Sequence, residues 1–204
     1  AEQFKMLYNE QRMNQGGDPY DYTVWNADTD WQDEMFQTGF LTNNTVSITA
    51  SGDRSKFYLG LGYVMEEGSI KSEKLNKFTV NLHSEHKVTD FLRFGFQVNG
   101  VRALYPDAKG VGSALKAAPI APVYDTESGL LHTLPDFQRA QVWNPMIEPV
   151  LRGAHNKSAN YRMAGNIYGE LDLMKNLTFK ATFSLDYASS PSRSYSPLIY
   201  VYNP

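Results

Sequence analysis

The sequence predicts an all-β fold: a segment of a large antiparallel transmembrane β-barrel, about six strands long, with long extracellular loops. Three observations support this prediction. Six stretches alternate apolar and polar residues with a period of two, as strands with one apolar and one polar face do. The connections between them are short on one rim and long on the other, which is typical of outer-membrane barrels. No apolar run approaches the roughly 20 residues that a membrane-spanning helix needs, whereas a barrel strand needs only alternate apolar residues.

The plainest strand covers 56–66, where Phe57, Leu59 and Leu61 point to one side while Lys56 and Tyr58 point to the other. The remaining expected strands cover 44–51, 77–86, 91–102, 161–173 and 177–187. Ahead of them, a helix is expected over 1–14, because apolar residues fall there at helical spacing before a glycine pair ends the pattern.

The connections divide the chain into loops and strands. Short turns lie near 52–55, 88–90 and 174–176, and longer connections near 67–75 and 105–157. Because successive antiparallel strands reverse direction, all short turns fall on one rim and all long loops on the other. We therefore expect the following division: 1–43 an extracellular loop region, 44–104 four strands, 105–157 a long extracellular loop, 158–188 two strands, and 189–204 the start of the next extracellular loop.

Two alternatives share the alternating pattern. A secreted carbohydrate-binding β-sandwich also alternates, but the strands here run about 10–12 residues, against about 5–6 in globular sheets. A structureless connection of roughly fifty residues would also be unusual in a compact domain. A small non-plugged porin or adhesion barrel is the second alternative. Six strands cannot close such a barrel, since the smallest has eight, and open edges in lipid are costly. We therefore expect part of a larger barrel.

Composition excludes several classes of protein. The net charge of −3, with both signs scattered, shows no nucleic-acid footprint. The absence of cysteine argues against a disulfide-rich secreted domain. The chain opens AEQFKM, with neither a start Met nor a signal peptide, which indicates a mature product or a piece of a longer one.

No enzymatic motif is present, so we expect no catalytic residue, no metal site and no cofactor. His83 and His86 are three apart on an expected strand and project to opposite faces, so they cannot chelate one ion together. The acidic residues around Trp31 lack the spacing and central glycine of an EF-hand. Ser113 and Lys116 match the S-x-x-K of penicillin-recognising enzymes without its companion motifs.

The segment 105–157 is the strongest candidate for ligand binding. It combines aromatic faces, on which sugar rings stack, with polar groups that bond hydroxyls. Packing of the loop onto its neighbours or onto a partner protein accounts for most of these side chains, so only Trp143 and Tyr124 are taken as candidate substrate-binding residues. The full set is Tyr105, Tyr124, Phe137, Trp143, Asp107, Asp125, Asp136 and Arg139.

Several phrases, in order, resemble one family, the SusC/RagA-type TonB-dependent transporters of Bacteroidetes outer membranes. The resemblance covers nearly the whole chain, and its most specific parts are the TDW…GF phrase and the SG…K-F-Y…GY…EG…K phrase. The matching stretches are LYNEQRMNQGG, TDWQDEMFQTGF, the run from Asn44 to Phe96, KAAPIAPVYDTESG and WNPM.

This resemblance implies a longer protein with an N-terminal carboxypeptidase-like domain, a plug, and a 22-stranded barrel whose lumen the plug fills. It also implies a SusD-like lipoprotein lid, energy from TonB–ExbB–ExbD, and import of oligosaccharides or oligopeptides. This chain would then be a segment near the start of the barrel domain, and it would contain neither the TonB box nor the plug. Its lumen-facing polar residues are then expected to pair with one another or with the plug; they are Arg93, Gln97, Asn99, Arg162, Asn166 and Glu170.

Overall fold

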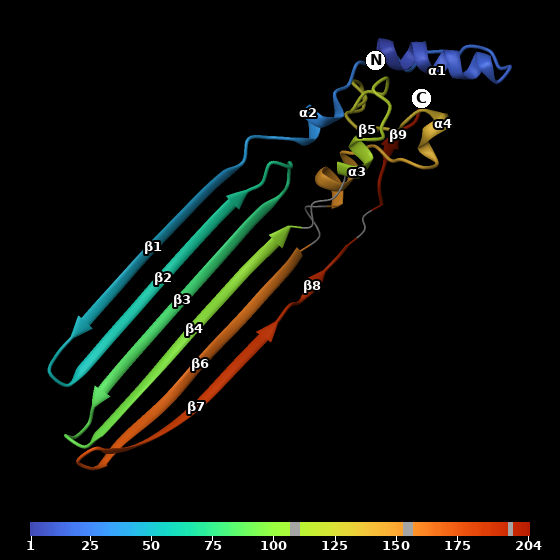
Figure 1. Ribbon diagram of the computed structural model, residues 1–204. Helices are drawn as coiled ribbons and strands as arrows, with labels where there is room; N and C mark the ends of the chain where they lie inside the picture. Colours follow the sequence, from blue (N-terminus) through green and yellow to red (C-terminus); the bar gives the residue numbers. More distant parts are fainter. Residues whose placement is uncertain (107–110, 153–156, 196–197) are drawn as a thin grey trace.

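One long antiparallel sheet dominates the computed structural model, which describes residues 1–106, 111–152, 157–195 and 198–204 (Figure 1). The six predicted strands are confirmed and pair with one another in chain order. They are β1 (Phe40–Ser51), β2 (Ser55–Glu67), β3 (Lys74–Lys87), β4 (Leu92–Pro106), β6 (Lys157–Met174) and β7 (Leu177–Ser189). The short β8 (Ser192–Arg193) continues the pairing along β6.

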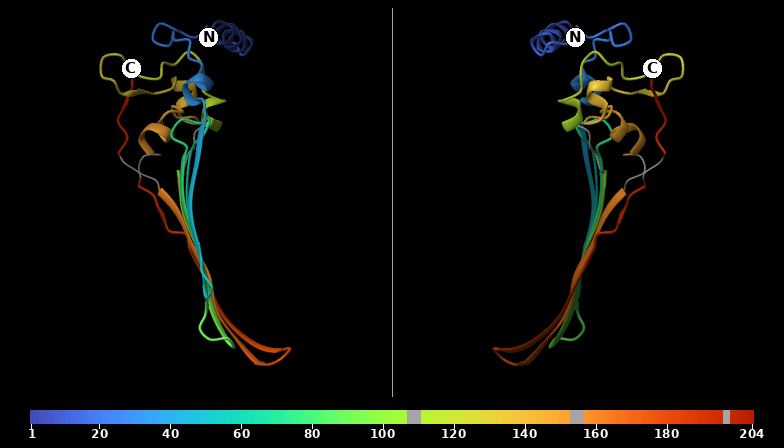
Figure 2. Two further views of the ribbon diagram at one scale, coloured as in Figure 1. Left: turned by 90° about the vertical axis from the view of Figure 1, so that its left-hand side faces the viewer. Right: turned by 90° about the vertical axis from the view of Figure 1, so that its right-hand side faces the viewer.

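The β-sandwich alternative is wrong. In the described ranges no second sheet packs face to face on the long one, because the only other sheet has two short strands. Seen edge-on in Figure 2, the long strands form a single curved and twisted layer. A single layer with one apolar face needs lipid against that face.

The strands extend further than the alternation alone indicated. β1 begins at Phe40, four residues ahead of the predicted start, and β6 begins at Lys157. In the first of these extensions Phe40 and Leu41 pair with Glu67 and Glu66. These pairs lie beyond the apolar band, where the two faces of a strand need not differ in polarity, so the period of two fades there.

The two rims of the sheet differ, as predicted. Three tight turns join β1 to β2, β3 to β4 and β6 to β7 at one end, which we call the short-turn rim. The long connections and both chain ends lie at the opposite end, the long-loop rim (Figure 1).

The register aligns apolar side chains into rows across the sheet. One row consists of Ile48, Leu59, Leu82, Val98, Gly165 and Leu185. The row next to it toward the long-loop rim consists of Val46, Leu61, Val80, Gly100, Met163 and Tyr187. Because directly opposed residues share a face, these rows form one continuous apolar surface, while the rows between them, such as Ser47, Gly60, Asn81, Asn99, Ala164 and Asp186, form a polar one.

The apolar surface has the height of a membrane. On β4 it extends from Leu92 to Arg102, a distance of ten residue steps or about 34 Å along the strand at about 3.4 Å per step. At a barrel tilt of about 40° this gives about 26 Å, close to the roughly 25 Å apolar band of outer-membrane barrels. Leu82 and Val98, which pair directly, lie near its middle.

The remaining elements gather at the long-loop rim into a unit that we call the cap, made of residues 1–39, 111–152 and 198–204 (Figure 1). Among the described residues, no helix is long and apolar enough to cross a membrane. The elements of the cap are α1 (Glu2–Asn14), α2 (Trp31–Met35), α3 (Val111–Ala114), β5 (Leu131–His132), α4 (Asp136–Arg139), a π-helical turn at Ile147–Arg152 and β9 (Val201–Tyr202).

Candidate functional site: the cap

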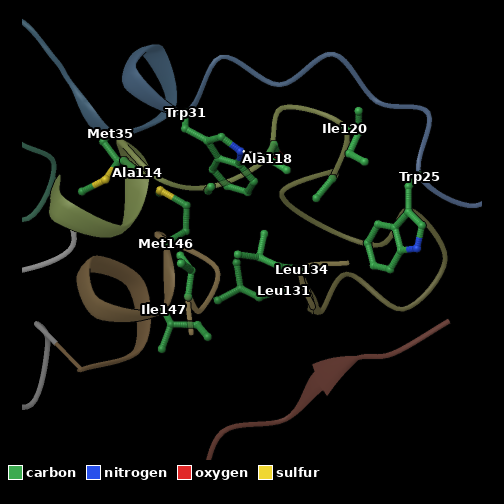
Figure 3. Packing of buried hydrophobic residues seen from close by; sticks show 13 residues of the cluster. Trp25, Trp31, Met35, Ala114, Ala118, Ile120, Leu131, Leu134, Met146 and Ile147 are labelled. Atoms are coloured by element: carbon green, nitrogen blue, oxygen red, sulfur yellow. Dashed lines mark hydrogen bonds between the residues drawn. The ribbon is translucent and has the colours of Figure 1, made fainter. Parts of the chain in front are cut away.

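The cap has its own hydrophobic core, although its sequence is polar and turn-rich. Trp31 and Met35 on α2 are 3% and 1% exposed, and they pack with residues of the 111–152 segment that include Ile120, Leu134 and Met146 (Figure 3). The 105–157 connection is therefore not structureless: its described part carries two short helices, a strand and a π-helical turn. The predicted helix over 1–14 is confirmed as α1.

The TDW phrase fixes the entry to the sheet. The Asp30 carboxylate accepts hydrogen bonds from the backbone N–H groups of Gln32 and Asp33, at 2.9 and 3.3 Å, and so caps α2. The Trp31 indole N–H donates to the Ala118 carbonyl at 3.0 Å in a buried position. The Thr29 hydroxyl donates to the Ala121 carbonyl at 2.7 Å. TDW thus binds the backbone of the KAAPIAP phrase, about ninety residues further along the chain.

The WNPM phrase holds the second half of the cap together. Asn144 is buried, and its amide Nδ2 donates to the carbonyls of Val123 and His132, at 3.0 and 2.9 Å. Its Oδ1 accepts from the Met146 N–H at 3.0 Å. All hydrogen-bonding positions of this amide but one are therefore used inside the cap, which is a structural role.

Aromatic rings join α1 to α4. Phe137 stacks on Tyr8 with ring centroids 4.4 Å apart and meets Tyr20 edge-on at 5.2 Å. The Tyr20 hydroxyl donates to Asp136 Oδ1 at 2.7 Å, and burial together with this carboxylate raises the pKa of Tyr20. Asn9, in the LYNEQ phrase, accepts from the Tyr20 N–H at 2.9 Å. These contacts account for Phe137 and Asp136 as packing residues.

A pocket of about 300 Å³ opens beside Trp143, and it is walled mostly by apolar atoms. This volume is at the lower end of the range for small-molecule sites. Arg139 and Asn203 bring polar groups to the wall, and Arg139 Nη1 donates to Asn203 Oδ1 at 2.9 Å. The residues lining the pocket are His132, Thr133, Leu134, Arg139, Val142, Trp143, Asn144, Ile147, Val201 and Asn203. Such a site suits an apolar ring or side chain with a hydrogen-bond acceptor at its edge.

The two candidate substrate-binding residues have different surroundings. Trp143 is 64% exposed and lines the pocket. Tyr124 is 43% exposed, its backbone pairs with Leu131, and it is not part of the pocket wall. Both rings are thus accessible to solvent, but of the two only Trp143 lines the pocket.

Two other side chains from the candidate set have local roles, and one cannot be placed. Asp125 Oδ2 accepts from the N–H and the hydroxyl of Ser128, at 2.7 and 2.6 Å, and these bonds hold the pKa of Asp125 below its usual range. Tyr105 is a half-exposed residue of β4. Asp107 lies outside the described residues.

Sequence reasoning missed His132 and Asn203 as pocket residues. The His132 ring is 4% exposed and meets the Trp25 ring at 5.0 Å and the Tyr202 ring at 5.1 Å. It comes together with the end of the chain because β5 and β9 pair in parallel, an association of two-residue strands that leaves no periodic signal.

The polar face of the sheet carries ion pairs near the short-turn rim. Arg93 binds Glu170 at 3.2 Å and Asp172 at 3.3 Å, and Lys180 binds Glu170 at 2.7 Å. Lys180 also lies 4.4 Å from the ring centroid of Tyr168, whose hydroxyl donates to Glu85 at 3.1 Å. The prediction of mutual pairing is confirmed for Arg93 and Glu170.

Further along this face, the Arg162 guanidinium donates two hydrogen bonds to the Asp186 carboxylate, at 2.7 and 3.2 Å. The register places Gln97 opposite Asn166, and Asn99 opposite Asn81. The polar face of the sheet therefore carries charged side chains that pair with one another and amide side chains that lie opposite one another.

The metal motifs give no site. His83 lies on the polar face, whereas His86 bonds Ser84 at 2.9 Å on the other, so the predicted divergence of the two rings is confirmed. Within the described ranges, no cluster of three or more His, Asp or Glu side chains could hold a metal ion.

Comparison with known proteins gives consistent results. No protein-family model matches the chain. The chain is 25% identical over 189 residues to TonB-dependent receptor P3 of Formosa agariphila, covering 86% of this chain and 18% of that protein. It is 30% identical over 115 residues to TonB-dependent receptor SusC of Bacteroides thetaiotaomicron, covering 54% of this chain and 12% of SusC. The chain thus spans less than a fifth of these relatives.

Solved structures agree on the fold. The RagAB peptide importer in its closed-closed state superposes with a TM-score of 0.66 at 18% identity, covering 82% of this chain and 20% of that one. A second structure, of the RagAB peptide transporter, gives 0.64 at 17% identity. A sheet with one lipid face, tight turns on one rim and a folded cap on the other defines a segment of an outer-membrane β-barrel.

The chain is thus similar in sequence to TonB-dependent receptors, including SusC, and its fold is that of part of the barrel wall in the RagAB structures. It therefore resides in the bacterial outer membrane. The small non-plugged porin is not favoured by these relatives, all of which are TonB-dependent receptors.

Proposed function

We propose that the protein containing this chain imports glycans or oligopeptides across the outer membrane, using energy from TonB–ExbB–ExbD and working with a SusD-like surface lipoprotein. The observation that carries this proposal is the match of 86% of the chain to a TonB-dependent receptor, in a region that folds as barrel wall. The division of the wall supports it, since the lipid face is apolar and the lumen face carries its own ion pairs.

In this proposal the chain performs no chemistry. The lipoprotein closes over the long-loop rim, which is extracellular, and so captures the substrate. TonB then displaces a plug that fills the lumen. The wall contributes a rigid polar surface, and the cap contributes a folded, partly aromatic surface at the entrance.

We further propose that Trp143 and Tyr124 contact the substrate. Trp143 is the better supported of the two, because its exposed ring borders a 300 Å³ pocket that also presents Arg139. A sugar ring or an apolar peptide side chain can stack on the indole, while a hydroxyl or carbonyl accepts a hydrogen bond from the guanidinium.

Growth tests the transport proposal. A strain lacking the full-length gene should fail to grow on one class of nutrient, oligosaccharides or oligopeptides, as its sole source, and the intact gene should restore growth. Disruption of TonB should abolish the restored growth. Unimpaired growth of the deletion strain on both classes, with no loss of uptake of labelled oligomers, would contradict the proposal.

The site proposal has its own test in the complemented strain. Trp143→Ala should lower uptake about fivefold or more, since loss of an aromatic anchor in a pocket costs more than about 1 kcal/mol. Leu115→Ala, at a 67% exposed position of the cap that does not line the pocket, is the matched control. Equal uptake by the two variants, at equal abundance in the outer membrane, would remove Trp143 from the site.

A further inference from the structure

One basic side chain lies on the apolar face of the sheet, which meets lipid, and not on the polar face that lines the lumen. Arg102 of β4 is opposite Phe78 of β3 and Tyr161 of β6, so it belongs to the lipid-facing row, not to the polar one. Its guanidinium lies 5.9 Å from the Tyr161 ring centroid. Among the described residues Arg102 has no carboxylate partner, and it is exposed.

The depth of Arg102 is that of a lipid headgroup. It marks the upper edge of the apolar band, toward the long-loop rim, and its row carries the aromatic residues Tyr63, Phe78 and Tyr161. Aromatic girdles occur where the hydrocarbon region meets the headgroups. A cation at this level contacts the phosphates of the leaflet, not its acyl chains.

An apolar groove lies directly below Arg102. It has a volume of about 420 Å³, and almost all of its lining is apolar. Gly100 forms its floor, since a Cβ added there would meet only Val80, at 3.9 Å. Phe78, Met163 and Tyr187 are among the residues that wall it. The absence of a side chain in one row leaves room for an acyl chain against the backbone.

More positive charge stands above Arg102 on the same face. Lys157 of β6 and Arg193 of β8 are directly paired across the sheet, and neither has a carboxylate partner in the described part of the chain. Lys74 lies on this face too, but it is bound to Glu67 at 2.9 Å. This patch therefore carries positive charge that no carboxylate of the described residues neutralises, and it would attract an anionic ligand.

We propose that Arg102 and the groove over Gly100 form a binding site for a phosphate-bearing lipid of the outer leaflet. The guanidinium binds the phosphate, one acyl chain lies in the groove between Val80 and Met163, and Lys157 and Arg193 hold the outer part of the headgroup. The proposal rests on the membrane location of the barrel and is independent of what the transporter imports.

The test uses the full-length transporter, extracted in detergent and analysed by native mass spectrometry with added lipid A and with lipid A stripped of its phosphates. The wild type should retain lipid A about tenfold or more better than it retains the dephosphorylated form, because the basic side chains of the patch attract the phosphate. Arg102→Gln should abolish this preference, and Gly100→Leu should weaken retention of both forms by filling the groove.

Lys77→Gln is the matched control, because Lys77 neighbours Phe78 on the same strand but lies on the polar face, opposite Ala103. It should retain lipid A as the wild type does. Equal retention by Arg102→Gln and Lys77→Gln, or equal binding of both lipid forms by the wild type, would overturn the proposal. Uptake of nutrient is measured in parallel, so that failure of the lipid site is seen separately from failure of transport.

Discussion

Adjacent residues of β3 offer a direct test of which face of the wall meets lipid. Leu82 pairs with Leu59 and Val98 in the apolar row near mid-height, whereas Asn81 pairs with Gly60 and Asn99 in the polar row. Leu82→Arg and Asn81→Arg therefore introduce the same side chain at the same depth on opposite faces.

The expected difference follows from depth. An arginine facing lipid at the bilayer midplane costs about 2–4 kcal/mol, falling to about 0–1 kcal/mol near the interfaces. Leu82→Arg should thus reduce the folding equilibrium constant roughly 30- to 700-fold, at about 1.4 kcal/mol per factor of ten. Leu61→Arg and Phe94→Arg lie nearer the edges of the apolar band and should cost less. Asn81→Arg should be mild, because it faces a polar surface.

The assay is urea unfolding of the full-length barrel in lipid vesicles, followed by its heat-modifiable migration in gels. A midpoint for Leu82→Arg well below that of Asn81→Arg, with Leu61→Arg and Phe94→Arg between them, is the expected order. Equal midpoints for Leu82→Arg and Asn81→Arg would refute the assignment of faces, and a larger loss for Asn81→Arg would reverse it.

Three further outcomes follow from the structure. Trp31→Phe should leave the Ala118 carbonyl without its donor at a cost of about 1–3 kcal/mol, and Trp31→Ala should cost about 3–5 kcal/mol; both should raise protease nicking of the 111–152 segment while the barrel stays folded. Gly95→Ala should destabilise by about 1–3 kcal/mol, because its Cβ would overlap the Tyr168 ring, and adding Tyr168→Ala should recover part of this loss in a double-mutant cycle. The pKa of Asp125 is lowered, so its stabilisation of the 125–130 turn is complete above the ordinary carboxyl pKa of about 3.9 and is lost as pH falls through the lowered value. Hydrogen-exchange protection of the amides in this turn, corrected for intrinsic exchange, should therefore drop at that pH in the wild type. Asp125→Ala should show no such drop.

The sheet was predictable from the sequence because its signal is local. The alternation of Phe57, Leu59 and Leu61 specifies a face, and the tight turns specify which strands pair. The register then follows, since a slip of one residue would turn Leu59 into the lumen. Strand ends outside the apolar band were less predictable, because Phe40 and Leu41 there are adjacent apolar residues.

The cap was not predictable in this way. Its core joins Trp31 to Ala118 and Trp25 to His132, residues about ninety or more positions apart that come together only through turns and short helices. No period connects such residues. From the sequence alone, Trp143 and Tyr124 are equivalent candidates as aromatic loop residues, and only the fold shows that one of them borders a pocket.

The core of the cap has a mechanical consequence for the wall. It draws on the segment before β1, the turn between β2 and β3 through Ile70, the connection between β4 and β6, and the residues after β8. Each tight turn at the other end links only two neighbouring strands. The cap therefore links the strand ends along this part of the barrel circumference. The strands cannot separate at the long-loop rim without exposing a hydrophobic core to water. Elastic deformation of the wall under a load on the lumen is accordingly concentrated at the short-turn rim, where tight turns, strand hydrogen bonds and the ion pairs of Arg93 and Lys180 join neighbouring strands, but the hydrophobic core of the described residues does not reach.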